Sequence, residues 1–474
     1  MNKYTKLVKN VVTFAVGNLG SKLIVFLMLP FYTTILSTKE YGQIDLFTTT
    51  LSLLLPLITL NLIESVFRYS MDKQYNKKSV FTSIVVTCGL LFMLTLFTYQ
   101  LLGKEIFGGD YGYLFFCLLF LFILQSLFKQ FVRALQKLRI YMYSDLVNTI
   151  IFVSLNFYLL GKLNLGVNGY LISMIVAYTV DCILLFVGAR LYKYLAIGEF
   201  KPFLLRELIR YSTPLIPNAL MWWVINISDR YIITYYMGYE SNGVYSVATK
   251  FPSIIYMLYT VFNRGWQISA IEENDSESKS EFYSKIFTLV SQCLIIGSSI
   301  YILFNKFIIG LLVANEFAIA WEFTPLLVIG VVFSALSSFV GICYTTSKKT
   351  KGAFISSSIA AITNIILNLL LIPYMGIQGA CLATAISFLV MFIIRILDSK
   401  KYVILKFNII RFIASFVLLV VQLIFHLNEF EYSFVSELIM VIMIIILNHS
   451  FIRELSVFGK KIKYKFKVKY KNAL

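Results

Sequence analysis

Long apolar stretches, each separated from the next by a short polar segment, run through the whole chain of 474 residues. A helix needs about 20 apolar residues to cross the hydrocarbon core of a bilayer, and the stretches have about that length. The pattern predicts an all-α integral membrane protein with fourteen transmembrane helices. Their expected ranges are 10–36, 43–66, 80–102, 112–135, 142–161, 168–190, 211–237, 243–266, 282–304, 321–345, 353–372, 378–397, 408–427 and 435–453.

The composition supports this class and argues against metal chemistry. Hydrophobic residues make up 59% of the chain and charged residues 14%, whereas soluble proteins average about 45–50% and about 25%. The six cysteines all lie inside apolar stretches without metal-ligand spacing, and the two histidines, His426 and His449, fall on different expected helices. We therefore expect no metal site and no bound cofactor.

The basic residues predict the orientation in the membrane. The net charge is +18, and the basic side chains gather in the short segments between apolar stretches. With a cytoplasmic N-terminus, 34 of the 42 Lys and Arg residues lie in or beside cytoplasmic segments. This bias predicts a multi-pass membrane protein with both termini in the cytoplasm. It also explains the positive charge without a nucleic acid partner. The basic tail from Lys460 to Lys471 either rests on the inner leaflet, the interpretation we favour, or recognises a partner.

An internal repeat predicts two lobes. The sequence G-V-N-G-Y-L-I-S from Gly166 parallels G-I-Q-G-A-C-L-A from Gly376, and Y-G-Q-I-D-L-F-T-T-T parallels N-G-V-Y-S-V-A-T-K-F at 242–251. Six expected helices separate the copies, an even number, so both copies have the same orientation across the membrane. The expected division is an N-terminal six-helix lobe at 1–197, a parallel C-terminal six-helix lobe at 198–405, and two added helices with the basic tail at 406–474.

Polar residues inside the expected helices predict a cavity between the lobes. The helix at 211–237 carries Asn218, Trp222, Asn226 and Arg230 four residues apart, and hence on one face. A charge at the centre of a membrane helix costs about 2.5–3.5 kcal/mol, so it usually faces a wet cavity or a partner. Arg and Lys side chains suit phosphate, and aromatic rings suit sugars. The candidate substrate-binding residues are Asn18, Lys22, Asp45, Asn218, Trp222, Asn226, Asp229, Arg230, Lys250 and Tyr256.

Structural roles compete with these assignments. Asp229 could hold Arg230 in place or pair with other helices, and Lys250 could extend its ammonium toward the membrane surface. No P-loop, HExxH or GxSxG motif occurs in the sequence, so we expect neither an ATP-driven transporter nor a hydrolase, and no catalytic residue.

Two stretches carry a family resemblance. They are G-N-L-G-S-K-L…P-F-Y…L-x-x-x-E-Y-G in the first expected helix region and S-D-R-Y at 228–231. With the fourteen-helix plan, they make the chain resemble bacterial polysaccharide repeat-unit flippases of the Wzx type, as found in O-antigen and capsule biosynthesis. That family lies within the multidrug/oligosaccharidyl-lipid/polysaccharide exporter superfamily.

The resemblance implies a MATE-like transporter that alternates between inward- and outward-open states. Its cargo would be an undecaprenyl-pyrophosphate-linked oligosaccharide, moved from the cytoplasmic to the outer leaflet. The surrounding membrane lipids would be further partners. Lys22, Arg230 and Lys250 would map to the cationic central cavity of the family. A polysaccharide polymerase and glycosyltransferases are candidate protein partners, and coupling to H⁺ or Na⁺ stays open. A lipid II flippase and a cation-coupled multidrug exporter are the alternatives.

Overall fold

Helices make up nearly the whole of the computed structural model, which describes residue 24 and residues 26–102, 111–273, 277–347, 349–428 and 433–449. No strand occurs in these ranges, and the predicted all-α membrane fold is confirmed. The helices are α3 (Leu29–Ile35), α4 (Thr38–Ile58), α5 (Leu62–Met71), α6 (Lys77–Leu102), α7 (Gly112–Ala134), α8 (Leu138–Leu159), α9 (Gly166–Gly188), α10 (Pro202–Ser212), α11 (Ile216–Glu272), α12 (Lys279–Leu312), α13 (Thr324–Thr346), α14 (Lys351–Ser399), α15 (Ile409–Asn428) and α16 (Ser433–Leu447).

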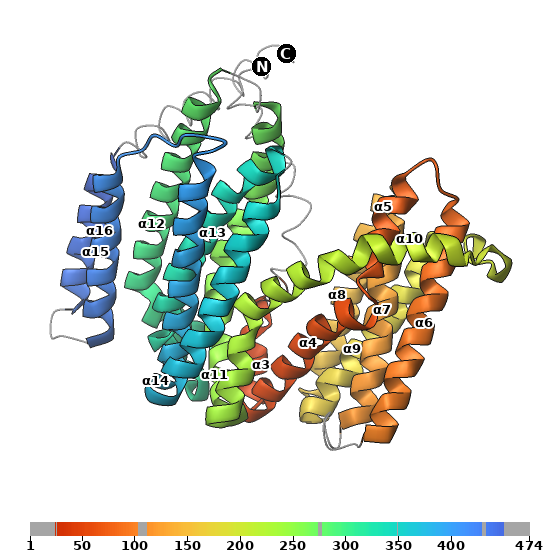
Figure 1. Ribbon diagram of the computed structural model, residues 1–474. Helices are drawn as coiled ribbons and strands as arrows, with labels where there is room; N and C mark the ends of the chain where they lie inside the picture. Colours follow the sequence, from red (N-terminus) through yellow and green to blue (C-terminus); the bar gives the residue numbers. More distant parts are fainter. Residues whose placement is uncertain are drawn as a thin grey trace, which may run out of the picture.

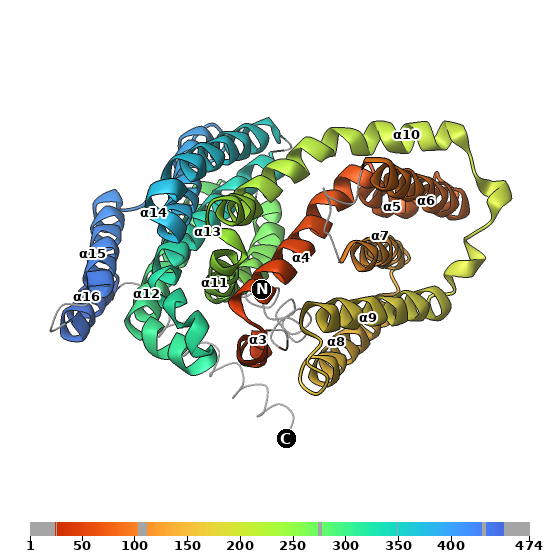
Figure 2. The same cartoon turned by 90° about the horizontal axis from the view of Figure 1, so that it is seen from below.

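The helices form two lobes that lie side by side (Figure 1, Figure 2). The N-lobe contains α3 to α9, and the C-lobe contains α11 to α14, with α15 and α16 packed against α12. The lobes meet near Ser37, where α4 lies against α11, and they diverge toward the opposite end, near Asp72 (Figure 1). These two sides of the molecule are called the Ser37 end and the Asp72 end below.

Two long helices are bent at glycines and each cross the molecule twice. The 57 residues of α11 and the 49 residues of α14 far exceed the length needed to span about 30 Å at 1.5 Å per residue. Gly238 in α11 has a φ of 83° and Gly376 in α14 a φ of 58°, values that glycine adopts without a Cβ clash. Each helix therefore provides two of the predicted spans, joined by a kink where the sequence suggested a loop.

The predicted helix 43–66 is divided in two. It begins at Thr38, where Ser37 and Glu40 form a capping box, and it stops at Ile58. Leu60 and Asn61 have positive φ, and α5 leaves this break at 61° to α4. The bend lets α4 lean toward the C-lobe while α5 packs back into the N-lobe. By length and composition, eight of the described helices can span a membrane, or nine if α4 and α5 count as one.

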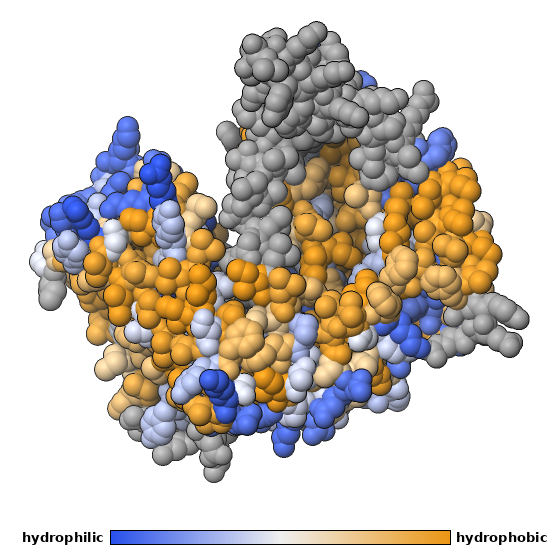
Figure 3. Space-filling view, turned by 180° about the vertical axis from the view of Figure 1, so that it is seen from behind, coloured by the Kyte–Doolittle hydropathy of each residue, from blue (hydrophilic) through white to orange (hydrophobic). Residues whose placement is uncertain are grey.

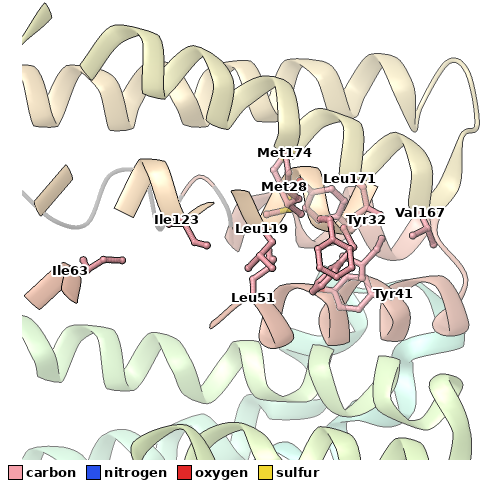
Figure 4. Close-up of a cluster of buried hydrophobic side chains, with 14 of the residues drawn as sticks. Met28, Tyr32, Tyr41, Leu51, Ile63, Leu119, Ile123, Val167, Leu171 and Met174 are labelled. Carbon is pink, nitrogen blue, oxygen red and sulfur yellow. The ribbon is translucent and has the colours of Figure 1, made fainter. Parts of the chain in front are cut away.

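Apolar side chains fill each lobe and also cover the outside of the molecule. In the N-lobe, Leu51, Leu119 and Leu171 from α4, α7 and α9 belong to one buried cluster (Figure 4). On the surface, hydrophobic residues form a broad band, and hydrophilic residues gather toward both ends (Figure 3). Such a band is what contact with lipid tails requires, so the molecule is built to sit in a bilayer.

Helix α10 connects the lobes but is fastened to the N-lobe. The Ser65 hydroxyl of α5 donates a 3.1 Å hydrogen bond to the Leu208 carbonyl of α10. The Tyr75 hydroxyl donates to the Glu207 carboxylate, and this bond raises the pKa of Tyr75 to about 12. Together these two hydrogen bonds attach α10 to the N-lobe.

Candidate functional site

A cavity of about 620 Å³ lies between the lobes. Its walls come from α3, α4, α8 and α9 on one side and from α11 on the other. The described side chains that line it combine a mostly apolar surface with polar and aromatic groups, among them Tyr32, Tyr41, Asp45, Thr48, Asp145, Thr149, Tyr170, Lys250, Ser253 and Tyr256. Volumes of about 300–1,000 Å³ are usual for sites that bind small molecules.

An ion pair joins the lobes beside this cavity. Arg230 of α11 donates from Nε to Asp45 Oδ2 of α4 over 2.7 Å, and the two side chains are 11% and 6% exposed. The Ser246 hydroxyl donates to the other carboxylate oxygen of Asp45, also over 2.7 Å. Charged hydrogen bonds of this kind are about twice as strong as neutral ones. Asp45 is therefore bound twice by the C-lobe.

The remaining nitrogens of Arg230 bind its own helix. Nη1 donates to the Asn226 carbonyl over 3.0 Å, and Nη2 donates to Thr249 Oγ1 over 3.3 Å. The guanidinium carbon also lies 5.7 Å from the ring centre of Tyr245. Four contacts thus hold the guanidinium of Arg230, and its Nε faces Asp45 of the N-lobe.

Asp229 faces away from this pair, into the C-lobe. Its carboxylate accepts hydrogen bonds from Tyr245 over 2.7 Å, from Thr384 over 2.6 Å, and from Asn368. No ion pair joins Asp229 to Arg230 in the described structure. The sequence offered Asp229 as the anchor of Arg230, but the anchor is Asp45 of the other lobe. Tyr245 contacts both residues, since its hydroxyl donates to Asp229 and its ring centre lies 5.7 Å from the guanidinium carbon of Arg230.

Two of the candidate residues, Lys250 and Tyr256, line the cavity. Across the described ranges, no hydrogen bond or ion pair holds the Lys250 ammonium, so it can bind an anion without losing a partner. The Tyr256 ring packs 6.1 Å from that of Tyr259, on the same face of α11.

The other candidate residues are less central. Asn218 is exposed near the start of α11, and Asn226 donates to the Trp222 carbonyl of its own helix over 2.7 Å. Trp222 is half-buried against the C-lobe core. None of these three lines the cavity among the residues that the structure describes. Asn18 and Lys22 lie outside the described residues.

At the Ser37 end the lobes meet backbone to backbone. A Cβ atom added at Gly42 would overlap the Tyr239 carbonyl oxygen, and one at Gly243 would overlap that of Thr38. Asn242 donates to the Gly42 carbonyl over 2.9 Å. Gly42 and Gly243 stand at corresponding places in the internal repeat, so the repeat brings its own copies into contact.

Two polar clusters were not anticipated from the sequence. In the N-lobe, Lys129 lies 2.9 Å from Asp145 and 3.1 Å from Asp181. In the C-lobe, Asn364 and Asn368 of α14 stand beside Asp229. The sequence did contain one signal of the N-lobe cluster, namely the isolated aspartates inside the expected helices 142–161 and 168–190. Lys129 was hidden because it looked like one of the basic residues at a helix end.

The family is shown by the N-terminal part of the chain. Residues 7–265, more than half of the protein, match the model of the family described as "Polysaccharide biosynthesis protein". The chain belongs to this family. It is also 30% identical over 134 residues to "Lsg locus putative protein 1" of Haemophilus influenzae, a match that spans 28% of this chain and 31% of that protein.

Solved structures of transporters share the fold. "Lipid II flippase MurJ, inward closed conformation" aligns over 94% of this chain and 99% of its own, with a TM-score of 0.70 and 17% identity. An inward-facing MATE family multidrug transporter covers 85% of this chain and 99% of its own at a TM-score of 0.69 and 10% identity. An outward-facing one covers 88% and 97% at 0.59 and 11%. At these identities the likeness concerns the fold alone, which is that of flippases and transporters.

Proposed function

We propose that the protein is a flippase that carries an undecaprenyl-pyrophosphate-linked oligosaccharide from the cytoplasmic to the outer leaflet, for surface polysaccharide synthesis. The observation that carries this proposal is the cavity between the lobes, where Lys250 meets an aromatic wall and whose lining residue Asp45 holds Arg230 beside it. Membership of the polysaccharide biosynthesis family and the flippase-like fold support it.

The distribution of basic residues supports an orientation with the Asp72 end in the cytoplasm of a bacterial cell. Lys73, Lys77 and Lys78 lie at this end, together with Lys400 and Lys401 after α14. Such a bias is typical of cytoplasmic segments. The lobes diverge at this end, and in our proposal the lipid-linked oligosaccharide enters between them from the leaflet in which it is made.

The two cations suit the pyrophosphate. Lys250 offers an ammonium without a partner in the described structure, and Arg230 offers a planar guanidinium that can bind two phosphate oxygens. Tyr170 and Tyr256 provide flat apolar faces with polar edges for the sugars. The lipid chain stays in the membrane beside the opening.

The cargo phosphate and Asp45 of the N-lobe compete for the guanidinium of Arg230. Arg230 pairs with Asp45, and this pair holds the lobes together next to the cavity. A phosphate that binds the guanidinium replaces Asp45 as its partner, so the ion pair between the lobes is lost when cargo enters. Differential binding of this kind is what a ligand needs to shift a conformational equilibrium. The cargo thereby favours the rearrangement that opens the opposite side.

Depletion of the protein in its own host tests the function. Lipid extracts analysed by mass spectrometry should show accumulation of a polyprenyl-pyrophosphate oligosaccharide, and surface polysaccharide should fall. Expression of Arg230→Ala should not reverse this, whereas Arg264→Ala, the same change at an exposed position of α11, should. Accumulation of lipid II would favour the lipid II flippase instead. Unchanged lipids with lost drug resistance would favour a multidrug exporter.

A further inference from the structure

The polar side chains that line the cavity between the lobes fall into two sets. Those of the first set are bound within the protein. The two lining carboxylates, Asp45 and Asp145, accept hydrogen bonds from basic side chains. The lining Ser and Thr hydroxyls donate to backbone carbonyls of their own helices, and they belong to Thr48, Thr149, Ser253 and Thr260. The second set has polar groups without a hydrogen-bond partner among the described residues, and its members are Tyr32, Tyr41, Tyr170, Lys250 and Tyr256.

Two phenols of the second set, Tyr41 of α4 and Tyr170 of α9, stand at the closed end of the cavity. A Cβ atom added at Gly166, where α9 begins, would overlap the carboxylate of Glu40, the residue before Tyr41. Tyr170 follows Gly166 by about one helical turn, so it lies near the level of Tyr41. The two phenols are also close enough to interact electrostatically. They therefore belong to one part of the cavity wall.

Neighbouring rings hold these two phenols in place. The Tyr170 ring makes edge-to-face contacts with Tyr32 and Phe152, with ring centres 5.7 and 5.3 Å apart. The Tyr41 ring packs against Phe317, with ring centres 5.6 Å apart. The Tyr32 hydroxyl is covered by the protein. Tyr41 and Tyr170 are thus the phenols at this end whose hydroxyls a ligand can use.

Lys250 lies about 12 Å from the level of Tyr41, measured along the helices at about 1.5 Å per residue. The reference is the hydrogen bond from Ser246 of α11 to Asp45 of α4, which brings these two residues to one level. Tyr41 precedes Asp45 by four residues, and Lys250 follows Ser246 by four in the opposite direction along the molecule. A pyrophosphate bound at Lys250 therefore leaves room for a sugar between it and the two phenols.

The surroundings of the two hydroxyls suit an acetamido group. Leu29, Leu36 and Ile44 line the same cavity and are almost fully buried. An acetamido group has a carbonyl oxygen that accepts from a phenol and an N–H that donates to a phenol oxygen. Its methyl group packs on apolar side chains. A plain sugar hydroxyl makes hydrogen bonds but leaves the apolar part of this wall without a contact.

We propose that Tyr41 and Tyr170 form a subsite for the acetamido group of an N-acetylated sugar in the cargo. The subsite rests on the proposed function and adds to it a choice among sugars. An acidic sugar fits less well, because its carboxylate would lie about one turn from Asp45, which loses its counter-charge when a phosphate binds Arg230. The cationic part of the cavity then binds the pyrophosphate, and the tyrosine part distinguishes the sugars.

Binding of three short-chain probes to the purified full-length protein tests the subsite. The probes are farnesyl pyrophosphate alone and the same lipid carrying either N-acetylglucosamine or glucose. The two sugar probes differ only in the acetamido group. The unmodified protein should bind the acetamido probe about 3 to 10 times more tightly than the glucose probe, as expected for one or two hydrogen bonds. Tyr170→Phe should remove most of this preference, whereas farnesyl pyrophosphate, which has no sugar, should bind as before.

Tyr178→Phe is the matched control. Tyr178 lies on the same helix and packs on Phe122 with ring centres 6.1 Å apart, but it is not among the described residues that line the cavity. Its preference should equal that of the unmodified protein. Tyr41→Phe is the second test variant and should weaken the preference as Tyr170→Phe does. Equal binding of both sugar probes by the unmodified protein would overturn the subsite, as would a preference that survives in both test variants or is lost in the control.

The result with farnesyl pyrophosphate separates the subsite from the proposed function. A protein that binds this probe but does not distinguish the two sugars has the cationic cavity without the subsite. A protein that binds none of the three probes contradicts the proposed function itself, and the subsite with it.

Discussion

The Ser37 end and the Asp72 end of the lobe interface are built very differently. At the Ser37 end, Gly42 and Gly243 let two helix backbones touch, and the Ala314 amide donates to the Thr33 hydroxyl over 3.2 Å. Tyr41 and Phe317 add an edge-to-face contact with ring centres 5.6 Å apart. At the Asp72 end the lobes stand apart, and the segment from α10 into the start of α11 runs from the N-lobe to the C-lobe (Figure 2).

The difference shows where the gate of this conformation lies. Closure at the Ser37 end depends on the absence of side chains at two glycines and on a few polar bonds, so a small change there alters the whole interface. The Asp72 end has no comparable set of contacts within the described residues. The Asp45–Arg230 pair lies next to the closed contact, at the edge of the cavity. Three substitutions test whether these contacts hold the lobes together at the Ser37 end.

The largest effect is expected from Asp45→Asn. It leaves Arg230 nearly buried without its counter-charge, and the loss of one partner of a buried pair costs about 3–5 kcal/mol. Thermal unfolding in detergent should occur at a clearly lower temperature. Adding Arg230→Gln should restore part of the loss, because the unpaired charge is then gone.

Asp398→Asn is the matched control for this variant. Asp398 also pairs with a cation, Lys401, at 2.6 Å, but that lysine is 71% exposed. Pairs of this kind contribute about 0–1 kcal/mol. If Asp45→Asn and Asp398→Asn lowered the unfolding temperature equally, the pair between the lobes would have no special role.

Gly243→Ala should open the Ser37 end. The added methyl group overlaps the Thr38 carbonyl of the other lobe, and such overpacking costs about 1–3 kcal/mol. A cysteine introduced at the fully buried Phe317, in a protein without its native cysteines, should then react about 10 to 100 times faster with a thiol reagent. Gly310→Ala adds the same methyl group where nothing lies within 4 Å, and should change nothing. Equal reactivity in both variants would show that the glycine contact does not hold the lobes closed.

The smallest effect is expected from Thr33→Val. It removes the hydroxyl that accepts the Ala314 amide proton but keeps the volume, and one hydrogen bond contributes about 1 kcal/mol. The reactivity of the same cysteine at position 317 should rise by no more than about fivefold. A larger rise than that of Gly243→Ala would mean that polar bonds, not backbone fit, decide the closure.

The sequence predicted the fold well because bilayer physics leaves few choices. Apolar length sets the spans, and this pattern can be read directly from the sequence. The internal repeat includes Gly42 and Gly243, the two glycines at which the lobes touch. The sequence alone could not show that these two copies are in contact. The kinks at Gly238 and Gly376 looked like loops, because a glycine with positive φ and a short turn have the same sequence signature.

The site was predicted less completely, since partners distant in the chain decide it. Arg230 and Asp45 were both chosen as candidates, but nothing in the sequence indicated that they pair with each other across 185 residues. Asp229 seemed the natural partner of Arg230 because it is adjacent. Neighbours on a helix point in different directions, by about 100°, so adjacency predicts divergence. Lys129 and Asp181 were overlooked for the same reason, since only the packing of α7 against α9 brings them together.

The central claim is that Arg230 binds the anionic head of a lipid-linked oligosaccharide as the cargo crosses the membrane. It is tested most directly by measuring which leaflet holds that lipid, in inside-out membrane vesicles treated with an enzyme that modifies only exposed glycans. With Arg230→Ala at normal protein level, the oligosaccharide should accumulate on the cytoplasmic leaflet, whereas Arg264→Ala should match the unmodified protein. A normal distribution in Arg230→Ala vesicles would contradict the account.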